Sequence, residues 1–182
     1  ADFEKHNSFR CNDGCPNIVR VDPPKEIYTK CPKANKVYCD MIFKLDIEPF
    51  SDDYYCGKVF EYIATNGFLS VFYKKLRLEK NWIYHMDSVL DVTCYDSDFT
   101  ITFNTDSKNF WNCYQEIFKS LDKLKRSIPT TTFNMAMAKI RTDKAKTITN
   151  NQINQINQHI SYQISLGVKP TSLSTYYNNL LK

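Results

Sequence analysis

Residues 36–48 read KVYCDMIFKLDIE, and their side chains alternate between apolar and mostly polar types along the whole stretch. Apolar residues occupy every second position from Val37 to Ile47. A period of two is typical of a strand with one buried and one solvated face. Pro49 and the acidic turn after it end the pattern. The stretch therefore predicts a half-buried strand that the rest of the chain must cover.

The next apolar-rich stretch, residues 62–77, reads YIATNGFLSVFYKKLR. Its Asn66-Gly67 pair favours a type I′ turn, because both residues adopt positive φ at little cost. We therefore expect an antiparallel hairpin in which Tyr62 faces Val71. One face of this hairpin is the better candidate for the core, and it would collect Phe60, Tyr62, Ala64, Leu69, Val71 and Tyr73.

Further strands are expected within residues 82–94 and at 99–104, where apolar and polar side chains again alternate. Residues 107–128 then place aromatic and aliphatic side chains at helical spacing, and Pro129 ends that pattern. The sequence thus predicts an α+β fold, an antiparallel β-meander sheet packed by one amphipathic helix. It also predicts a core domain over 36–128, a Cys-rich irregular segment over 1–35 and a polar helical extension over 129–182.

The chain is basic toward its C-terminus, with 11 Lys/Arg against 4 Asp/Glu over residues 105–182. Within the extension, four isoleucines recur three or four residues apart among Asn and Gln: Ile153, Ile156, Ile160 and Ile164. So narrow an apolar stripe cannot fill a core of its own. We expect this helix either to lie along the domain or to mediate assembly with another chain.

Seven cysteines are disulfide candidates: Cys11, Cys15, Cys31, Cys39, Cys56, Cys94 and Cys113. The cysteines in the polar, Pro-containing N-terminal segment favour disulfides. The cysteines at predicted strand and helix positions are equally suited to be buried free thiols. The connectivity stays open. An extracellular or other oxidising compartment is the first expectation. An intracellular location is the alternative, because the chain contains no Asn-x-Ser/Thr sequon.

Catalytic and metal-binding patterns are absent from the sequence. Its three histidines show no HExxH-like spacing, and no P-loop, GxGxxG or GxSxG motif occurs. The spacing of the first four cysteines is too wide for a zinc knuckle. We therefore expect no cofactor and no enzymatic activity. A secreted, disulfide-stabilised protein that binds another protein is the first hypothesis, and an intracellular assembly subunit is the second.

A third hypothesis rests on a resemblance. A hairpin, further antiparallel strands and one helix with an early Trp111, over residues 57–128, resemble a pleckstrin-homology-type barrel. The resemblance implies a module that binds phosphoinositide headgroups through basic residues around the first hairpin. The matching positions are Lys58, Lys75 and Arg77, with Lys74 beside them. These residues lack the glycine-flanked aromatic signature of RNA-binding sheets, so nucleic acid is an unlikely ligand, and no apolar run is long enough to span a membrane.

Overall fold

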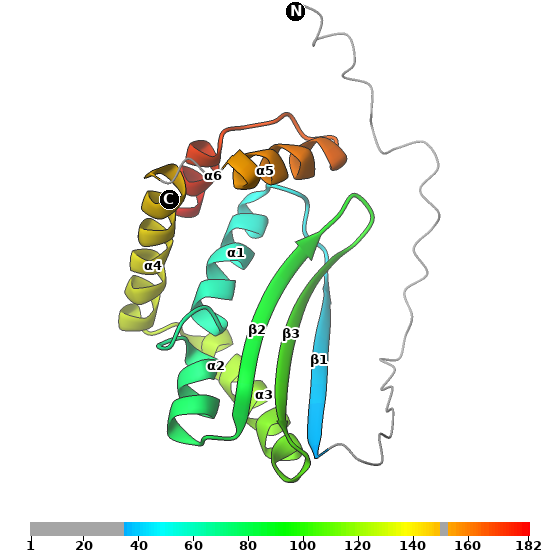
Figure 1. The fold of residues 1–182 in the computed structure, drawn as a ribbon, viewed down its shortest axis with the longest axis vertical. Coiled ribbons are helices and arrows are strands. Elements are labelled where there is room, and N and C mark those ends of the chain that lie inside the picture. The colour runs from blue at the N-terminus through cyan, green and yellow to red at the C-terminus, as the bar shows by residue number, and fades with distance from the viewer. Residues whose placement is uncertain (1–34, 150–152) are drawn as a thin grey trace, which may run out of the picture.

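The computed structural model describes residues 35–149 and 153–182 (Figure 1). Its sheet consists of β1 (Lys36–Leu45), β2 (Ile83–Val92) and β3 (Ser97–Asp106), in the order β1-β3-β2 with all pairs antiparallel. The helical elements are α1 (Asp52–Ala64), α2 (Val71–Tyr73), the π-helical turn η2 (Lys74–Glu79), the 3₁₀ turn η3 (Ser107–Asn109), α3 (Phe110–Arg126), α4 (Thr130–Thr149), α5 (Ile153–Ser165) and α6 (Leu173–Leu180). The α+β class with an antiparallel sheet and a helical C-terminal extension is thereby confirmed.

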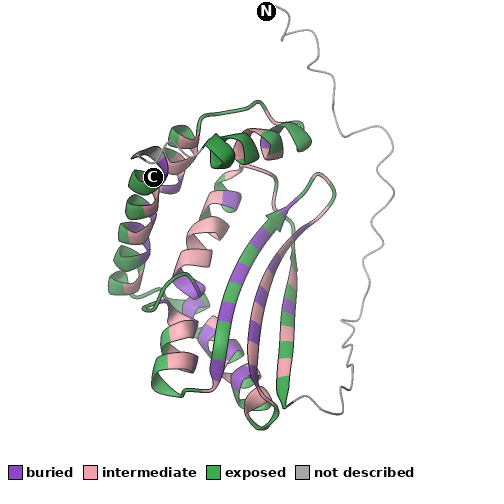
Figure 2. Ribbon diagram, in the orientation of Figure 1, coloured by how far each residue is buried: buried purple, intermediate pink, exposed green. Residues whose placement is uncertain are grey.

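The strand predicted first, at residues 36–48, forms as β1, but its place in the sheet differs from a simple meander. β3 is central and pairs with both other strands, so β1 lies at one edge and β2 at the other. In β3, every second residue from Ser97 to Thr105 is buried, as Figure 2 shows by its alternating colours. The helices cover this inward face, where Phe99 lies between Phe43 of β1 and Leu90 of β2.

The hairpin predicted around Asn66-Gly67 is wrong, because residues 52–79 are mostly helical. Ser51 caps α1 by accepting a hydrogen bond from the Tyr54 backbone N–H, and two aspartates occupy the first turn. Both features stabilise a helix N-terminus. Asn66-Gly67 does form a turn, with Gly67 at φ +107°, but the turn leads from α1 toward α2. The predicted pairing of Tyr62 with Val71 and the six-residue core face therefore do not exist.

Helix α1 lies close against β2 and binds its backbone at the sheet edge. Gly57 permits the approach, since a Cβ there would lie 2.7 Å from Leu90 Cδ2. Lys58 Nζ donates to the Leu90 carbonyl at 2.8 Å, and Glu61 accepts from the Leu90 N–H. Burial raises the pKa of Glu61 above its ordinary value, while the Lys58 ammonium opposes that shift. The two side chains thus take the place of a neighbouring strand at this point.

The helix predicted at residues 107–128 is confirmed as α3, preceded by η3. Its buried residues Cys113, Ile117 and Leu124 belong to the same apolar core as the inward face of the sheet. Helices α4 and α6 add a second, smaller cluster of Met137, Ile140 and Leu180, which packs on Tyr55 and Val59 of α1. The extension therefore contacts the domain through α1. The division of the chain at residues 35 and 128 stays a prediction.

Candidate functional site

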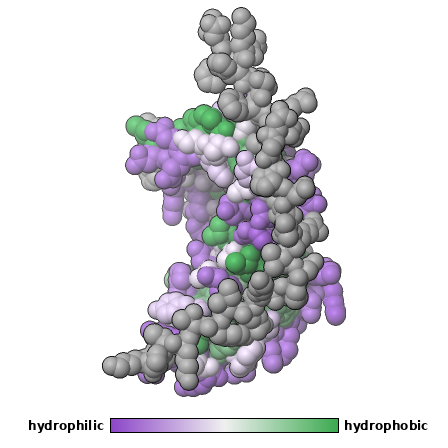
Figure 3. Space-filling view, turned by 90° about the vertical axis from the view of Figure 1, so that its right-hand side faces the viewer, coloured by the Kyte–Doolittle hydropathy of each residue, from purple (hydrophilic) through white to green (hydrophobic). Residues whose placement is uncertain are grey.

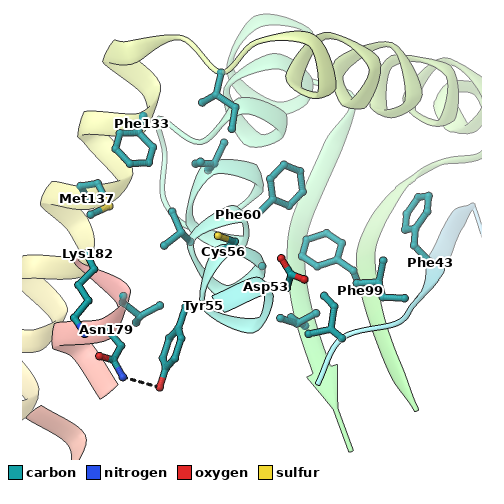
Figure 4. A pocket seen from close by; sticks show the side chains of 18 of the residues that line it. Phe43, Asp53, Tyr55, Cys56, Phe60, Phe99, Phe133, Met137, Asn179 and Lys182 are labelled. Atoms are coloured by element: carbon teal, nitrogen blue, oxygen red, sulfur yellow. Dashed lines mark hydrogen bonds between the residues drawn. The ribbon is translucent and has the colours of Figure 1, made fainter. Parts of the chain in front are cut away.

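An apolar groove of about 730 Å³ lies on the helical side of the sheet, between α1, α3, α4 and α6 (Figure 4). We call it the α1 groove, because α1 supplies more of its lining than any other element. The lining residues are Phe43, Leu45, Ile47, Asp53, Tyr55, Cys56, Gly57, Val59, Phe60, Ile63, Leu90, Phe99, Leu121, Ile128, Phe133, Met137, Asn179, Leu180 and Lys182.

Helix α1 has two sides with different tasks. Tyr54, Lys58 and Glu61 recur three or four residues apart on the side toward β2, where Lys58 and Glu61 bind the strand. Cys56 and Phe60 stand on the opposite side, which faces the groove. The helix is therefore held from one side while its other side lines the opening.

Beside the sheet residues Phe43, Leu45, Leu90 and Phe99, further walls come from three helices that are distant in sequence. Leu121 of α3 and Ile128, which lies just beyond the end of that helix, form one wall. Phe133 and Met137, one turn apart on α4, form the next wall. On α6, Asn179 donates a hydrogen bond of 3.1 Å to the Tyr55 hydroxyl, which joins α6 to α1 beside the groove. Tertiary packing thus brings residues as far apart in sequence as Phe43 and Lys182 to one surface.

The chemistry of the α1 groove is that of an apolar surface. Asp53 and Lys182 are the only charged residues among the described residues that line it, and Cys56 contributes an exposed thiol. The described ranges contain no group of three or more His, Cys, Asp or Glu side chains that would hold a metal ion. No helix in these ranges is both long enough and apolar enough to cross a membrane. The arrangement is suited to bind apolar side chains and to exclude water from them.

A cluster of aromatic rings beside the groove joins α1 to α5 and α6. Tyr54 stacks obliquely on Phe50, and His159 packs against Phe50 and Tyr176. Burial raises the pKa of the Tyr54 and Tyr176 hydroxyls above their ordinary values. Burial likewise lowers the pKa of His159 below its ordinary value of 6.5. All these side chains are held in their neutral forms near neutral pH, as suits packing in a domain interior.

Three of the four basic residues predicted as a headgroup site have local structural contacts. Lys58 is bound to Glu61 and β2, Lys75 pairs with Glu79 at 2.8 Å, and Arg77 donates to the Ile83 carbonyl at 2.9 Å. Lys74 starts the same turn η2. The hairpin that would have grouped these residues is replaced by helices, so the basis of the pleckstrin-homology arrangement is wrong.

The four isoleucines of the predicted assembly stripe do share one helix, α5. Ile153 and Ile164 are 66% and 57% exposed, Ile156 is also exposed, and Ile160 is half-buried. The stripe therefore faces mostly away from the rest of the described molecule.

The seven cysteines fall into three sets. Cys39, Cys56 and Cys113 have free thiols, and no disulfide joins two cysteines within the described ranges. Burial, followed by nearby Asp40 and Cys113, raises the pKa of Cys39 to about 11. Cys94 Sγ lies 3.7 Å from the Ser165 carbonyl oxygen. The predicted positions Cys11, Cys15 and Cys31 lie outside the described residues.

Sequence reasoning missed the groove entirely. Its strongest available signal was Ser51 followed by two aspartates, a helix start that would have placed Cys56, Val59 and Phe60 on a helix. The Asn-Gly pair outweighed that signal. The groove itself needs contacts between segments more than a hundred residues apart, such as Asn179 with Tyr55, and local patterns do not carry such contacts.

Comparisons with known proteins give a consistent result. A sequence model described as "Peptidase M16 inactive domain" matches residues 13–140. A crystal structure of a peptidase M16 inactive domain from Pseudomonas fluorescens is similar in fold, with a TM-score of 0.64 and 13% identity. That match covers 81% of this chain but 34% of the bacterial chain, so this chain spans about a third of its length. A comparison with curated proteins finds no significant match.

Proposed function

Because the chain belongs to the peptidase M16 inactive-domain family, we propose that it is a non-catalytic domain that binds another protein through the α1 groove. The observation that carries the proposal is the groove itself. Its described lining is mostly apolar, with Asp53 and Lys182 as the charged residues in it. Exposed apolar surfaces of this size on folded domains commonly mark binding sites.

The non-catalytic part of the proposal is supported by the side chains that the groove lacks. Peptide hydrolysis needs a nucleophile or activated water together with an acid or base in reach. Among the lining residues, Asp53 and Cys56 are the candidate groups, and neither of the two described histidines lines the groove. The histidines His85 and His159 lie on β2 and α5, and His159 packs among aromatic rings. The family description as an inactive domain agrees with this.

The protein-binding part is supported by the shape of the groove and by what holds it. α1 contributes groove residues from Asp53 to Ile63, which corresponds to about 15 Å of helix. The side of α1 away from the groove is anchored to β2 by Lys58 and Glu61. A rigid apolar groove of this length suits the apolar face of a helix or an extended segment.

The test uses a phage-displayed library of random 15-residue peptides, which are longer than the roughly ten helical residues that cover about 15 Å at 1.5 Å of rise per residue. We expect the wild-type chain to select peptides with apolar stripes, and fluorescence anisotropy to show saturable binding. Cys56→Glu places a charge at an exposed groove position and should abolish that binding. Val89→Glu, on the exposed outer face of the sheet, is the matched control and should leave it intact. Failure to select any peptide, or cleavage of the peptides, would contradict the proposal.

We also propose the oxidising location and the disulfides as part of this function. Once the three free thiols are set aside, Cys11, Cys15, Cys31 and Cys94 remain, an even number that could pair as two bridges. The chain purified from its source should then take up three alkyl groups when denatured without reductant and seven with it. Intact mass spectrometry gives the count. Seven alkyl groups in both samples would contradict the oxidising location and leave the groove proposal unaffected.

A further inference from the structure

Helix α5 presents its apolar stripe outward and its polar side inward, the reverse of an ordinary surface helix. Ile153, Ile156 and Ile164 are exposed, whereas Gln163 on the adjoining face is 0% exposed. Figure 3 shows hydrophobic side chains at the end of the molecule where α5 lies. Apart from the half-buried Ile160, the stripe is therefore not packed against the part of the molecule that the structure describes.

Specific contacts on the inward side hold α5 in this orientation. Gln163 Oε1 accepts from the Thr171 N–H at 2.6 Å, and its Nε2 donates to the Thr171 carbonyl at 3.2 Å. The Tyr162 hydroxyl donates to the Val92 carbonyl at 2.6 Å, which ties the helix to the end of β2. Turning the isoleucines inward would break these bonds and bury unpaired polar groups. The outward stripe is thus a stable property of the fold.

The stripe and the α1 groove match in length, and an uncharged helix suits the apolar lining of the groove. Ile153 to Ile164 spans about 16 Å of helix, close to the stretch of α1 that lines the groove. α5 contains no Asp, Glu, Lys or Arg, and its stripe is flanked by uncharged Asn and Gln. Such a helix enters an apolar groove without burying a charge, which would be costly.

A helix cannot fill the groove of its own chain while its inward contacts are kept. Figure 1 shows α5 lying across the upper end of α1 and the sheet, rather than along α1. On the basis of the proposed protein-binding function, we propose that the groove of one copy receives the α5 stripe of a second copy. If the contact is reciprocal, the same two surfaces are used twice around a two-fold axis, as in closed dimers.

The experiment measures the mass of the full-length chain by sedimentation equilibrium over rising concentration. The wild type should pass from one chain to two. Cys56→Glu in the groove and the double variant Ile153→Glu/Ile164→Glu in the stripe should each remain a single chain. Val59→Asp is a second groove variant, and Val89→Glu is the control that should dimerise like the wild type. Circular dichroism confirms that each variant is folded.

Mixing the two classes of variant gives the sharper readout. Cys56→Glu retains an intact stripe and the stripe variant retains an intact groove, so the mixture should form one heterologous contact, which fluorescence anisotropy of a labelled chain detects. Three results would overturn the inference. The first is a wild type that stays a single chain. The others are a dimer that survives both groove variants or the stripe variant, and a dimer that is lost on Val89→Glu. If the chain selects displayed peptides but does not dimerise, the assignment of a second copy as the occupant is wrong. The proposed protein-binding function would then still stand.

Discussion

Helices α3 and α5 show similar sequence patterns and opposite orientations. Both repeat apolar residues every three or four positions. α3 turns its stripe to the sheet, so that Cys113 and Ile117 are completely buried. α5 turns its stripe to solvent and buries Gln163 instead. The comparison shows that an apolar stripe predicts an interface but does not say whether that interface lies within the chain.

The largest effect is expected from truncating the stripe of α3. Ile117→Ala removes buried methyl groups and leaves a cavity in the main core, which should lower the free energy of unfolding by about 2–5 kcal/mol. Urea denaturation followed by circular dichroism measures the loss. A loss below about 0.5 kcal/mol, the size typical of surface sites, would mean that α3 does not carry the core.

A smaller effect is expected at the buried amide of α5. Gln163→Ala leaves the Thr171 N–H and carbonyl without their partners. The free energy of unfolding should therefore fall by about 1–3 kcal/mol. Hydrogen exchange should place the loss of protection in α5 and the segment after it. Gln158→Ala, at an exposed position of the same helix, is the matched control. Equal effects of both substitutions would show that the inward side of α5 is not specifically docked.

His159 should make the docking of α5 sensitive to acid, with a smaller effect again. Its folded pKa lies below 6.5 because it is buried against Phe50 and Tyr176, near Gln163. Just below pH 6.5 the unfolded chain therefore binds more protons at this residue than the folded chain does. The stability that neutral His159 contributes is fully present above pH 6.5 and falls as the pH drops below that value. Thermal unfolding measured from neutral to acidic pH should show a falling unfolding temperature in the wild type and a smaller fall in His159→Gln. Parallel curves would exclude His159 as the cause.

The smallest effect is expected from the outward stripe. Ile164→Ala repeats the chemistry of Ile117→Ala at a site that is 57% exposed, and it should change the unfolding free energy by no more than about 0.5 kcal/mol. The measurement is made at a concentration where the chain is single, so that association does not contribute. A loss comparable to that of Ile117→Ala would show that α5 packs its stripe within one chain.

The parts of the fold that sequence reasoning predicted are those with strong, local periodicity. β1 and β3 alternate with period two, and α3 repeats at helical spacing up to Pro129. The segment of α1 failed because its apolar residues fit either period, and the Asn-Gly pair favoured a hairpin. Packing on Leu90 and the Ser51 cap decide for the helix.

The candidate site was less accessible to sequence reasoning than the fold. The stripe of α5 could be identified from spacing alone, but its outward orientation depends on bonds to Thr171 and Val92. The α1 groove combines β1 with residues near position 180, so no window of sequence contains it. Lys58 was assigned to ligand binding because its partner on β2, a backbone carbonyl, carries no signal in the sequence.

The contacts of Lys58 and Glu61 with Leu90 also determine in which direction the sheet can be extended. At the β2 edge, an incoming strand would have to displace both side chains from the Leu90 backbone and separate α1 from the sheet. At the opposite edge, β1 pairs only with β3 among the described residues. Exposed edges recruit strands from other chains unless they are blocked. The domain is thus closed to fibrillar stacking through β2, and any enlargement by further strands is directed to the β1 side.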